Sequence, residues 1–475
     1  MKKSLFLPLL LLLTAGWANA EEFPPREWLG REWFGIYLVG EKAGYGYTEL
    51  AAQTDGGHRQ TFFFRYRVGL PGGAQDMETT REMNFDRTGQ LQSFSRKLDS
   101  PLGLNRAEGK RGQDGFFVLN NGSGTFIPSP PILLEDCYAE NLLARNRSAP
   151  GTEREAVNFD IDLGGPIESS CRVENVQNRF PGGVDTPLWE ITTTIKKLGI
   201  ELTSIIDGTG KSITSQMGDS ILLKAESEQQ AKELSKAWDY LNYARIEPDA
   251  PLPAPEGART LGFLVYGLPP EFDPPTSTTQ KVKRKPGGEA IFLISRGAEP
   301  SRPPPFPVFA PELAQWTAST PIFQAEDPAI AAAARRVAGK APNSYAAAVA
   351  LNDWVFSQLE KQFLLALPDA RSVLNRRAGD CKSHSVLLVA LARSLGIPAR
   401  LVAGVAPALD GAFYYHQWVE VWTGEWIALD PAFGQARVEP DHIVLFRGEV
   451  PDMLGLAGLL GRLRISPFQP GEESP

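Results

Sequence analysis

The chain has 475 residues, 42% of them hydrophobic and 22% charged, with 45 glycines, 39 prolines and three cysteines. This length allows two or three domains with full cores, and the ordinary hydrophobic fraction argues against a disordered or fibrous protein. The formal net charge is −8. Because the chain is acidic and has no long basic run, nucleic acid and anionic lipid are poor candidate partners.

The first 20 residues have the pattern of a secretory signal peptide. Two lysines at positions 2 and 3 precede an apolar run over 5–13, and an Ala-Asn-Ala motif at 18–20 offers a cleavage site. The run is shorter than the roughly 20 residues that a membrane helix needs. We therefore expect a periplasmic or secreted protein of bacterial type, with no stable membrane insertion after removal of the signal. An uncleaved anchor is the alternative.

Residues 21–247 are predicted to form a β-rich N-terminal domain. In the segment 59–68, aromatic and apolar side chains alternate with arginines, as expected of a half-buried strand. An Asp-x-Thr-Gly turn occurs at 86–89 and again at 207–210, after similar sets of strands. This repeat suggests a duplicated β unit, and a duplicated sheet that curls over itself is one architecture that it permits. Apolar residues at helical spacing predict a packing helix over 226–245.

Composition changes divide the rest of the chain. Residues 248–311 contain two short strand patterns and a proline-rich stretch, which predict a small β piece followed by a semi-rigid linker. Residues 312–450 form the next predicted domain, in which helices start near Asp327 and Asn343. Residues 451–475 are a C-terminal tail. The predicted fold class is α+β.

The three cysteines are Cys137, Cys171 and Cys381. In an oxidising compartment, an odd count suggests one pair and one free thiol. We expect a disulfide between Cys137 and Cys171, which would stabilise the fold by about 3–4 kcal/mol in the chain-entropy model. The alternative is that both are buried thiols. Cys381 then remains free.

Cys381 begins a predicted helix of unusual character. The residues that follow it, 386–392, are apolar on nearly every face, and the helix closes at the Gly-Ile-Pro of 396–398. A helix that is apolar all round is buried, and the positive end of its dipole favours the thiolate form of a cysteine in its first turn.

Three predicted strands follow, over 399–405, 413–422 and 425–430. The second carries His416 and the third ends in Asp430. A cysteine at a helix start, a histidine on a strand and an aspartate on the neighbouring strand can serve as nucleophile, base and orienting group.

This constellation resembles the transglutaminase-like superfamily, whose members share a papain-like core with a Cys-His-Asp triad. The resemblance lies in the segment from Gly379 to Arg400 and in the motifs HQWVEV at 416–421 and GEWIALDP at 424–431. It covers roughly 90 residues, and about 300 residues before it lie outside. By position, the resemblance implies that Cys381 is the nucleophile, His416 the base and Asp430 the orienting carboxylate.

Such a triad performs acyl transfer on amide bonds through a thioester, to water or to an amine. The expected substrate is a peptide or protein, with cell-wall peptides as one case. Trp418 is a candidate substrate-binding residue, and we expect no metal and no cofactor. His384 could tune the thiol, although a packing histidine or a zinc ligand are the alternatives. Two other functions stay open, namely a cell-wall peptidase or amidase and a non-catalytic periplasmic binding or scaffolding protein.

Overall fold

The computed structural model describes residues 23–470 except for 71–72, 101–102, 163–164, 178–186, 197–199, 235, 253–257, 271 and 364–367. The predicted signal peptide lies outside the described residues. No helix in the described part of the chain is long and apolar enough to cross a membrane.

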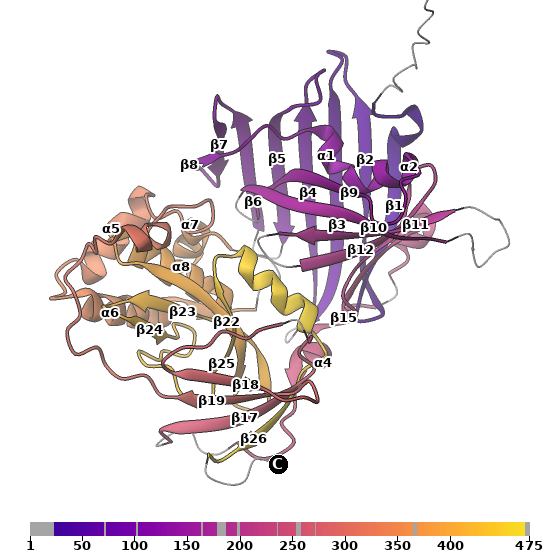
Figure 1. The fold of residues 1–475 in the computed structure, drawn as a ribbon. Coiled ribbons are helices and arrows are strands. Elements are labelled where there is room, and N and C mark those ends of the chain that lie inside the picture. Colours follow the sequence, from indigo (N-terminus) through magenta and orange to yellow (C-terminus); the bar gives the residue numbers. More distant parts are fainter. Residues whose placement is uncertain are drawn as a thin grey trace, which may run out of the picture.

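One large antiparallel sheet forms most of the N-terminal region (Figure 1). Its order, β8-β7-β6-β5-β4-β3-β2-β1-β14-β13-β12-β11-β10-β9, contains two successive meanders that meet where β1 pairs with β14. The short helices α1 (Leu134–Cys137) and α2 (Ala139–Arg145) connect the two meanders, and the 3-10 turn η1 (Arg26–Trp28) precedes the first. The strands are β1 (Gly30–Leu38), β2 (Glu41–Ala52), β3 (His58–Leu70), β4 (Gly73–Phe85), β5 (Leu91–Ser100), β6 (Gly103–Arg111), β7 (Gly115–Asn120), β8 (Ser123–Pro128), β9 (Glu153–Asp160), β10 (Gly165–Gln177), β11 (Leu188–Ile195), β12 (Ile200–Asp207), β13 (Ser212–Met217) and β14 (Ile221–Ala225).

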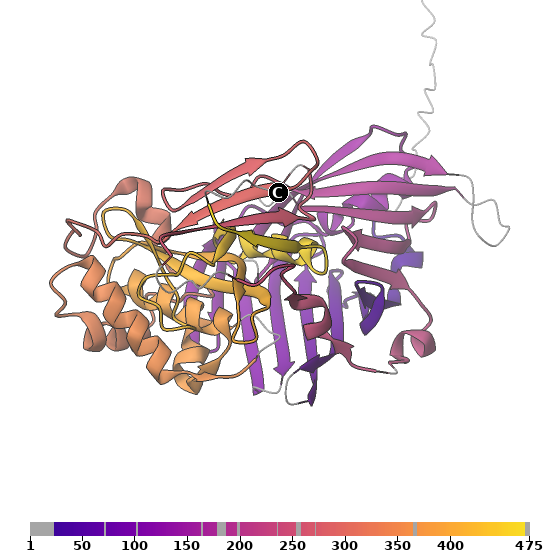
Figure 2. The same cartoon turned by 90° about the horizontal axis from the view of Figure 1, so that it is seen from below.

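The sheet curls over itself, which is the architecture that the repeated turn permitted. Phe94 of β5 and Phe116 of β7 each contact Phe159 of β9, with ring centroids 4.7 and 4.8 Å apart. These strands are far apart in the sheet order, so the second meander must fold across the first. Figures 1 and 2 show this arrangement, with the magenta strands forming a layer against the indigo and purple ones.

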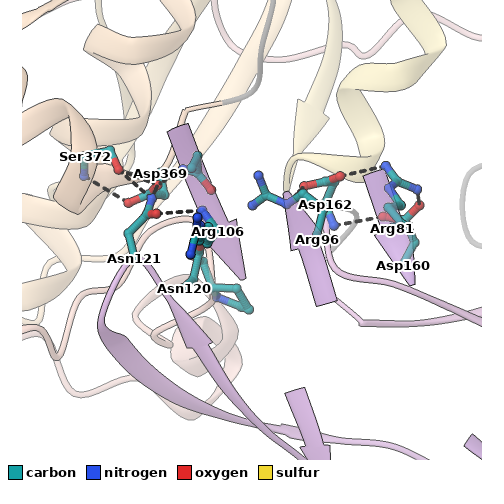
Figure 3. A network of polar contacts seen from close by, with 11 residues as sticks. Arg81, Arg96, Arg106, Asn120, Asn121, Asp160, Asp162, Asp369 and Ser372 are labelled. Carbon is teal, nitrogen blue, oxygen red and sulfur yellow. Dashed lines mark hydrogen bonds and ion pairs between the residues drawn. The ribbon is translucent and has the colours of Figure 1, made fainter. Parts of the chain in front are cut away.

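A cluster of charged side chains joins the two layers (Figure 3). Arg81 of β4 reaches Asp160 at 2.5 Å and Asp162 at 2.6 Å, and the Nε of Arg96, on β5, lies 3.2 Å from Asp162. Arg96 is only 4% exposed. A guanidinium as buried as that of Arg96 must be paired, so its contact with Asp162, together with the two ion pairs of Arg81, fixes how the second meander sits on the first.

The prediction of a single helix over 226–245 is wrong. The segment forms α3 (Glu228–Lys232), β15 (Trp238–Asp239), α4 (Tyr240–Ala244) and β16 (Arg245–Ile246). β15 pairs in parallel with β3, and Trp238 is buried in a cluster with Val68 of that strand. Tertiary packing of this tryptophan outweighs the local helical spacing.

The C-terminal part packs helices against a mixed set of strands. Helix α8 (Cys381–Ser394) is buried on nearly all sides, as predicted. It packs against the helices α5 (Pro328–Ala338), α6 (Ser344–Gln358) and α7 (Ala370–Arg376) on one side and against a sheet on the other. The order of this sheet is β16-β23-β22-β25, and β24 also pairs with β23. The sheet strands are β22 (Ala399–Pro407), β23 (Phe413–Trp422), β24 (Trp426–Leu429) and β25 (Ile443–Gly448). The segment 226–246, called the connector below, thus adds β15 to the N-terminal sheet and β16 to the C-terminal one, where β16 pairs with β23.

A second, four-stranded sheet of order β18-β19-β17-β26 lies beside the first. It joins segments from both sides of the helical part, namely β17 (Thr260–Tyr266), β18 (Gln280–Arg284), β19 (Ala290–Ser295) and β26 (Arg464–Phe468). A small parallel pair, β20 (Glu360–Lys361) with β21 (Ala378–Gly379), precedes α8, and the 3-10 turns η2 (Pro311–Trp316) and η3 (Pro451–Leu459) complete the described elements.

The predicted disulfide between Cys137 and Cys171 is not formed, and all three cysteines are free. Cys137 packs against the core cluster around Phe94, whereas Cys171 belongs to a different cluster and accepts a hydrogen bond from Thr193 at 3.3 Å. Burial raises the pKa of the Cys137 thiol to about 12 and that of Cys171 to about 11. The prediction was wrong because the number of cysteines does not show whether two of them lie close together in the fold.

Candidate active site

Cys381 is the first residue of α8, where the helix dipole places positive charge. The helix starts there because Asp380 is its N-cap, and the Asp380 carboxylate accepts a hydrogen bond from the Ser383 backbone N–H at 3.2 Å. The Lys382 ammonium lies 2.5 Å from the same carboxylate. The thiol is half-buried, so it remains accessible while its helix is anchored in the core.

His416 projects from β23, opposite Gly404 of β22. Its Nε2 lies 2.7 Å from Asp430 Oδ2, and it also shares a hydrogen bond with Cys381. With Nε2 engaged by Asp430, the ring leaves Nδ1 for the thiol. The imidazole is stacked between Phe433, at 4.4 Å, and Trp418, at 5.9 Å, which fixes its plane. The structure thus brings Cys381, His416 and Asp430 together.

Asp430 is held by a tight turn that follows β24. Its backbone pairs with Gln435, and its Oδ1 accepts hydrogen bonds from the N–H groups of Ala432 and Phe433 at 2.7 and 3.0 Å. The side chain is fully buried. The same turn places Phe433 over His416, so the sequence that fixes the carboxylate also builds one wall around the base.

One further member of this group, His442, was not predicted from the sequence. Its Nε2 lies 3.2 Å from Asp430 Oδ2, and its Nδ1 lies 2.7 Å from Asp441 Oδ1. Since carboxylates can only accept, both ring nitrogens of His442 carry protons and the ring is positively charged. The chain has only four histidines, and the Asp441-His442 pair before the apolar run 443–446 is the signal that could have indicated it.

These contacts set the charges of the site. Burial alone would lower the pKa of His416, but the charge and hydrogen bond of Asp430, with a smaller contribution from Cys381, raise it to about 10. Burial would raise the pKa of Asp430, yet the charge and hydrogen bond of His416 and the bond from His442 hold it well below its usual range. His442 has a raised pKa because its bonds to Asp430 and Asp441 outweigh burial.

His384 lies one helical turn after Cys381 and is fully buried. Its Nδ1 lies 2.8 Å from the carbonyl oxygen of Asp380 and therefore carries the ring proton. Burial lowers the pKa of this histidine, so the ring is neutral. Among the described residues, the cluster that could hold a metal ion is instead His416, Asp430 and His442, in which the nitrogens facing Asp430 already donate hydrogen bonds to it.

The N-terminal region contacts the segment that leads to the nucleophile. Asp369, the N-cap of α7, accepts hydrogen bonds from Asn105 and Asn121 of that region at 2.8 and 2.7 Å (Figure 3). The Asp369 side chain also bonds Ser372. Helix α7 ends at Arg376, five residues before Cys381.

A second contact from the connector lies on the other side of this segment. Tyr240 of α4 packs against Phe363 with ring centroids 4.9 Å apart, and the Lys382 ammonium lies 5.4 Å from the Phe363 ring. Burial, together with the nearby charges of Cys381 and Asp380, raises the pKa of Tyr240 to about 12. The chain that leads into Cys381 is therefore contacted by the N-terminal region at Asp369 and by the connector at Phe363.

Acyl transfer also needs donors for an oxyanion. The backbone N–H of Cys381 is the first candidate. Gln362 is a candidate for the second, because its own N–H donates to Gly379 at 3.0 Å, which places this segment beside the Cys381 loop. Trp418, the predicted substrate-binding residue, is only 1% exposed; it stacks on His416 and lines a cavity.

Comparison with protein families agrees with this geometry. Residues 331–431 match the model of the transglutaminase-like superfamily. The C-terminal part of the chain is a transglutaminase-like domain. The match includes Cys381, His416 and Asp430 and ends one residue beyond Asp430, so His442 lies outside it.

Similar solved structures are remote. A candidate cysteine protease from Cytophaga hutchinsonii shares 15% identity over 47% of this chain and 84% of its own, with a TM-score of 0.29. A beta-barrel-like protein of unknown function from Brucella abortus shares 14% identity over 42% of this chain and 97% of its own, with a TM-score of 0.32. A candidate protease from Parabacteroides distasonis shares 11% identity over 84% of this chain and 66% of its own, with a TM-score of 0.20. A search of curated proteins finds no match.

Proposed function

We propose that this protein is a cysteine-dependent acyl-transfer enzyme that acts on amide bonds of peptides or proteins. The observation that carries the proposal is the contact chain from the Cys381 thiol through His416 to the buried Asp430. A raised His416 pKa beside a thiol at a helix start favours a thiolate and imidazolium pair at neutral pH. Such a pair is the reactive form of a cysteine nucleophile.

The chemistry follows from the positions of these groups. The Cys381 thiolate attacks the amide carbonyl carbon, a C–S bond forms, and the backbone N–H of Cys381 stabilises the oxyanion. The C–N bond then breaks as the His416 imidazolium gives its proton to the departing amine. Water attacks the thioester while His416 accepts its proton, the C–S bond breaks, and a carboxylic acid leaves. Asp430 keeps the ring oriented in both steps.

Water is the default acceptor in this proposal because it is abundant, and an amine acceptor would make the enzyme a crosslinking transglutaminase. The signal-like N-terminus supports an exported protein whose substrates lie in the periplasm or outside the cell. Peptides of the cell wall are one substrate class with amide bonds in that place.

Trapping the thioester tests this function. The purified protein is incubated with casein and with cell-wall peptides in the presence of hydroxylamine, which converts a thioester into a hydroxamate that mass spectrometry detects. We expect hydroxamates with the wild type and none with Cys381→Ser. Cys137→Ser is the matched control, because that buried thiol contacts no triad residue, and it should leave the yield unchanged.

The acceptor is assigned from the products in the absence of hydroxylamine. New amino termini indicate peptide-bond hydrolysis, released ammonia indicates attack on side-chain amides, and incorporation of a fluorescent amine indicates crosslinking. If neither substrate pool gives a hydroxamate that depends on Cys381, the catalytic proposal fails and a binding role becomes the better account.

A further inference from the structure

A row of polar and aromatic side chains leads away from the triad along β23. His416, Trp418, Glu420 and Trp422 alternate with residues that pack on α8, so the four share one face of the strand. Neighbouring strands extend this face, because Arg400 of β22 pairs with Glu420, and Trp426 of β24 pairs with Trp422.

Apart from His416, the residues of this face form one wall of a cavity of about 600 Å³. The opposite wall comes from the small sheet, through residues 276–280 and 294–298. Trp418 and His442 close the end nearest the triad, whereas Cys381, His416 and Asp430 do not line the cavity. The cavity is therefore a separate site behind the catalytic residues, and its volume lies in the range of ordinary small-ligand pockets.

The walls carry an excess of positive charge. Four arginines and His442 line the cavity against three glutamates, in a chain whose net charge is −8. The lining arginines are Arg296, Arg400, Arg437 and Arg447. Two of them, Arg400 and Arg447, share the single carboxylate of Glu420, at 2.6 and 2.8 Å.

Arg437 is the cation that remains without a counter-charge. It is exposed, and its Nε and a terminal nitrogen donate to the carbonyl of Gly297 at 3.2 and 2.8 Å. Among the described residues, no carboxylate lies within ion-pair distance of it. Trp422 and Trp426 line the same cavity, with ring centroids 5.6 Å apart, and provide its apolar surface; the Arg400 guanidinium lies 4.0 Å from the Trp426 ring.

We propose that this cavity binds a small ligand with an apolar body and one anionic group. The anion, a carboxylate or a phosphate, pairs with Arg437 at the mouth, and the apolar body packs against Trp422 and Trp426. Arginine presents a fork of donors that suits either anion. Because His442 forms the inner wall and also holds Asp430, the ligand would lie two side chains away from the catalytic base.

Isothermal titration calorimetry tests the site with three probes, namely 4-phenylbutyrate, its neutral isostere 4-phenylbutanamide, and phenyl phosphate. We expect saturable binding of at least one anion, and at least tenfold weaker binding of the amide than of the carboxylate if the carboxylate binds. Arg437→Gln should weaken anion binding at least tenfold and leave amide binding unchanged. Arg59→Gln, which removes an exposed arginine on β3, is the matched control and should bind like the wild type.

Tighter binding of 4-phenylbutyrate or of phenyl phosphate assigns the anionic group. Cys381→Ala should bind the probes as the wild type does, so the test stands even if the protein proves not to be an enzyme. Absence of saturable heat with both anions, equal affinity for carboxylate and amide, or full affinity in Arg437→Gln would each overturn the proposal.

Discussion

The two sides of the nucleophile are built in different ways. On the side of the base, His416, Asp430 and His442 come from one stretch of 27 residues and contact each other through charged hydrogen bonds. On the other side, Asn105 contacts Asp369 across 264 positions of sequence, and Tyr240 approaches from the connector. The residues on the side of the base are thus close together in the sequence, whereas the segment that leads to Cys381 is held by contacts with the distant N-terminal sheet.

Changing Asp430→Asn should have the largest effect on the base side. In the wild type, Oδ2 accepts from both histidines and Oδ1 accepts from two backbone N–H groups. An amide must turn its NH2 toward one of these two sets of donors, so the carboxamide shifts and His416 loses its orientation. We expect activity to fall by roughly 10³–10⁴-fold, as triad carboxylate-to-amide changes do. Turnover with the substrate found by thioester trapping measures this. Asp353→Asn, on the exposed face of α6, is the control; a fall of less than tenfold in Asp430→Asn would contradict the assigned role.

The same variant changes the response to acid. The folded-state pKa of Asp430 lies below its unfolded value near 3.8, so its contribution to stability is present above that pH and is lost as the pH falls. Thermal unfolding between about pH 2 and 6 should show a steeper loss for the wild type than for Asp430→Asn. Parallel curves would mean that the carboxylate is not held as a buried anion.

Changing His442→Gln should have a smaller effect, because His416 still holds Asp430. A hydrogen bond to a charged group contributes about 1.5–3 kcal/mol, which corresponds to roughly a 10- to 100-fold loss of rate. His442 is a positioning residue, so the loss should appear in kcat more than in KM. The pH–rate profile should also shift, because without His442 the Asp430 carboxylate is held less firmly as the counter-charge of His416. If the pH–rate profile is unchanged and kcat falls only in proportion to the fraction of folded protein, His442 has a structural role alone.

The smallest effect on activity is expected from the N-terminal side. Asn105→Ala removes one donor from the buried Asp369 and should lower the free energy of unfolding by about 1.5–3 kcal/mol, with less than a tenfold change in turnover. Asn146→Ala, at the exposed end of α2, controls for loss of an asparagine. If Asn105→Ala impaired turnover as strongly as Asp430→Asn, the N-terminal sheet would take part in the chemistry and the contrast would break down.

The residues on the side of the base could be predicted from the sequence because they depend on short-range patterns. The buried character of α8, its N-cap and the strand alternation around His416 are all short-range patterns, so Cys381, His416 and Asp430 could be placed from residue types and spacing. His442 could not, because its contact with Asp430 depends on the turn at 430–435 and on the path that follows it.

Long-range contacts account for the other errors. The segment 226–245 has helical spacing, yet Trp238 is buried against β3 and the helix does not continue. The pairing of Cys137 with Cys171 failed because each thiol belongs to a different core cluster. The curled sheet was foreseen as one architecture of a repeated β unit, but nothing local indicated that its strands would support Asp369.

The most direct test of the account is the rate at which iodoacetamide alkylates Cys381 as a function of pH, measured by peptide mass for the wild type and for His416→Ala. Because the His416 pKa is raised to about 10, the imidazolium persists through neutral pH beside the Cys381 thiol, and a cationic neighbour favours the nucleophilic form of a thiol. We predict that at neutral pH the wild type is alkylated faster than His416→Ala, by about tenfold or more, and that the difference narrows as the pH rises. Identical pH dependence in the two proteins would contradict the assembled triad.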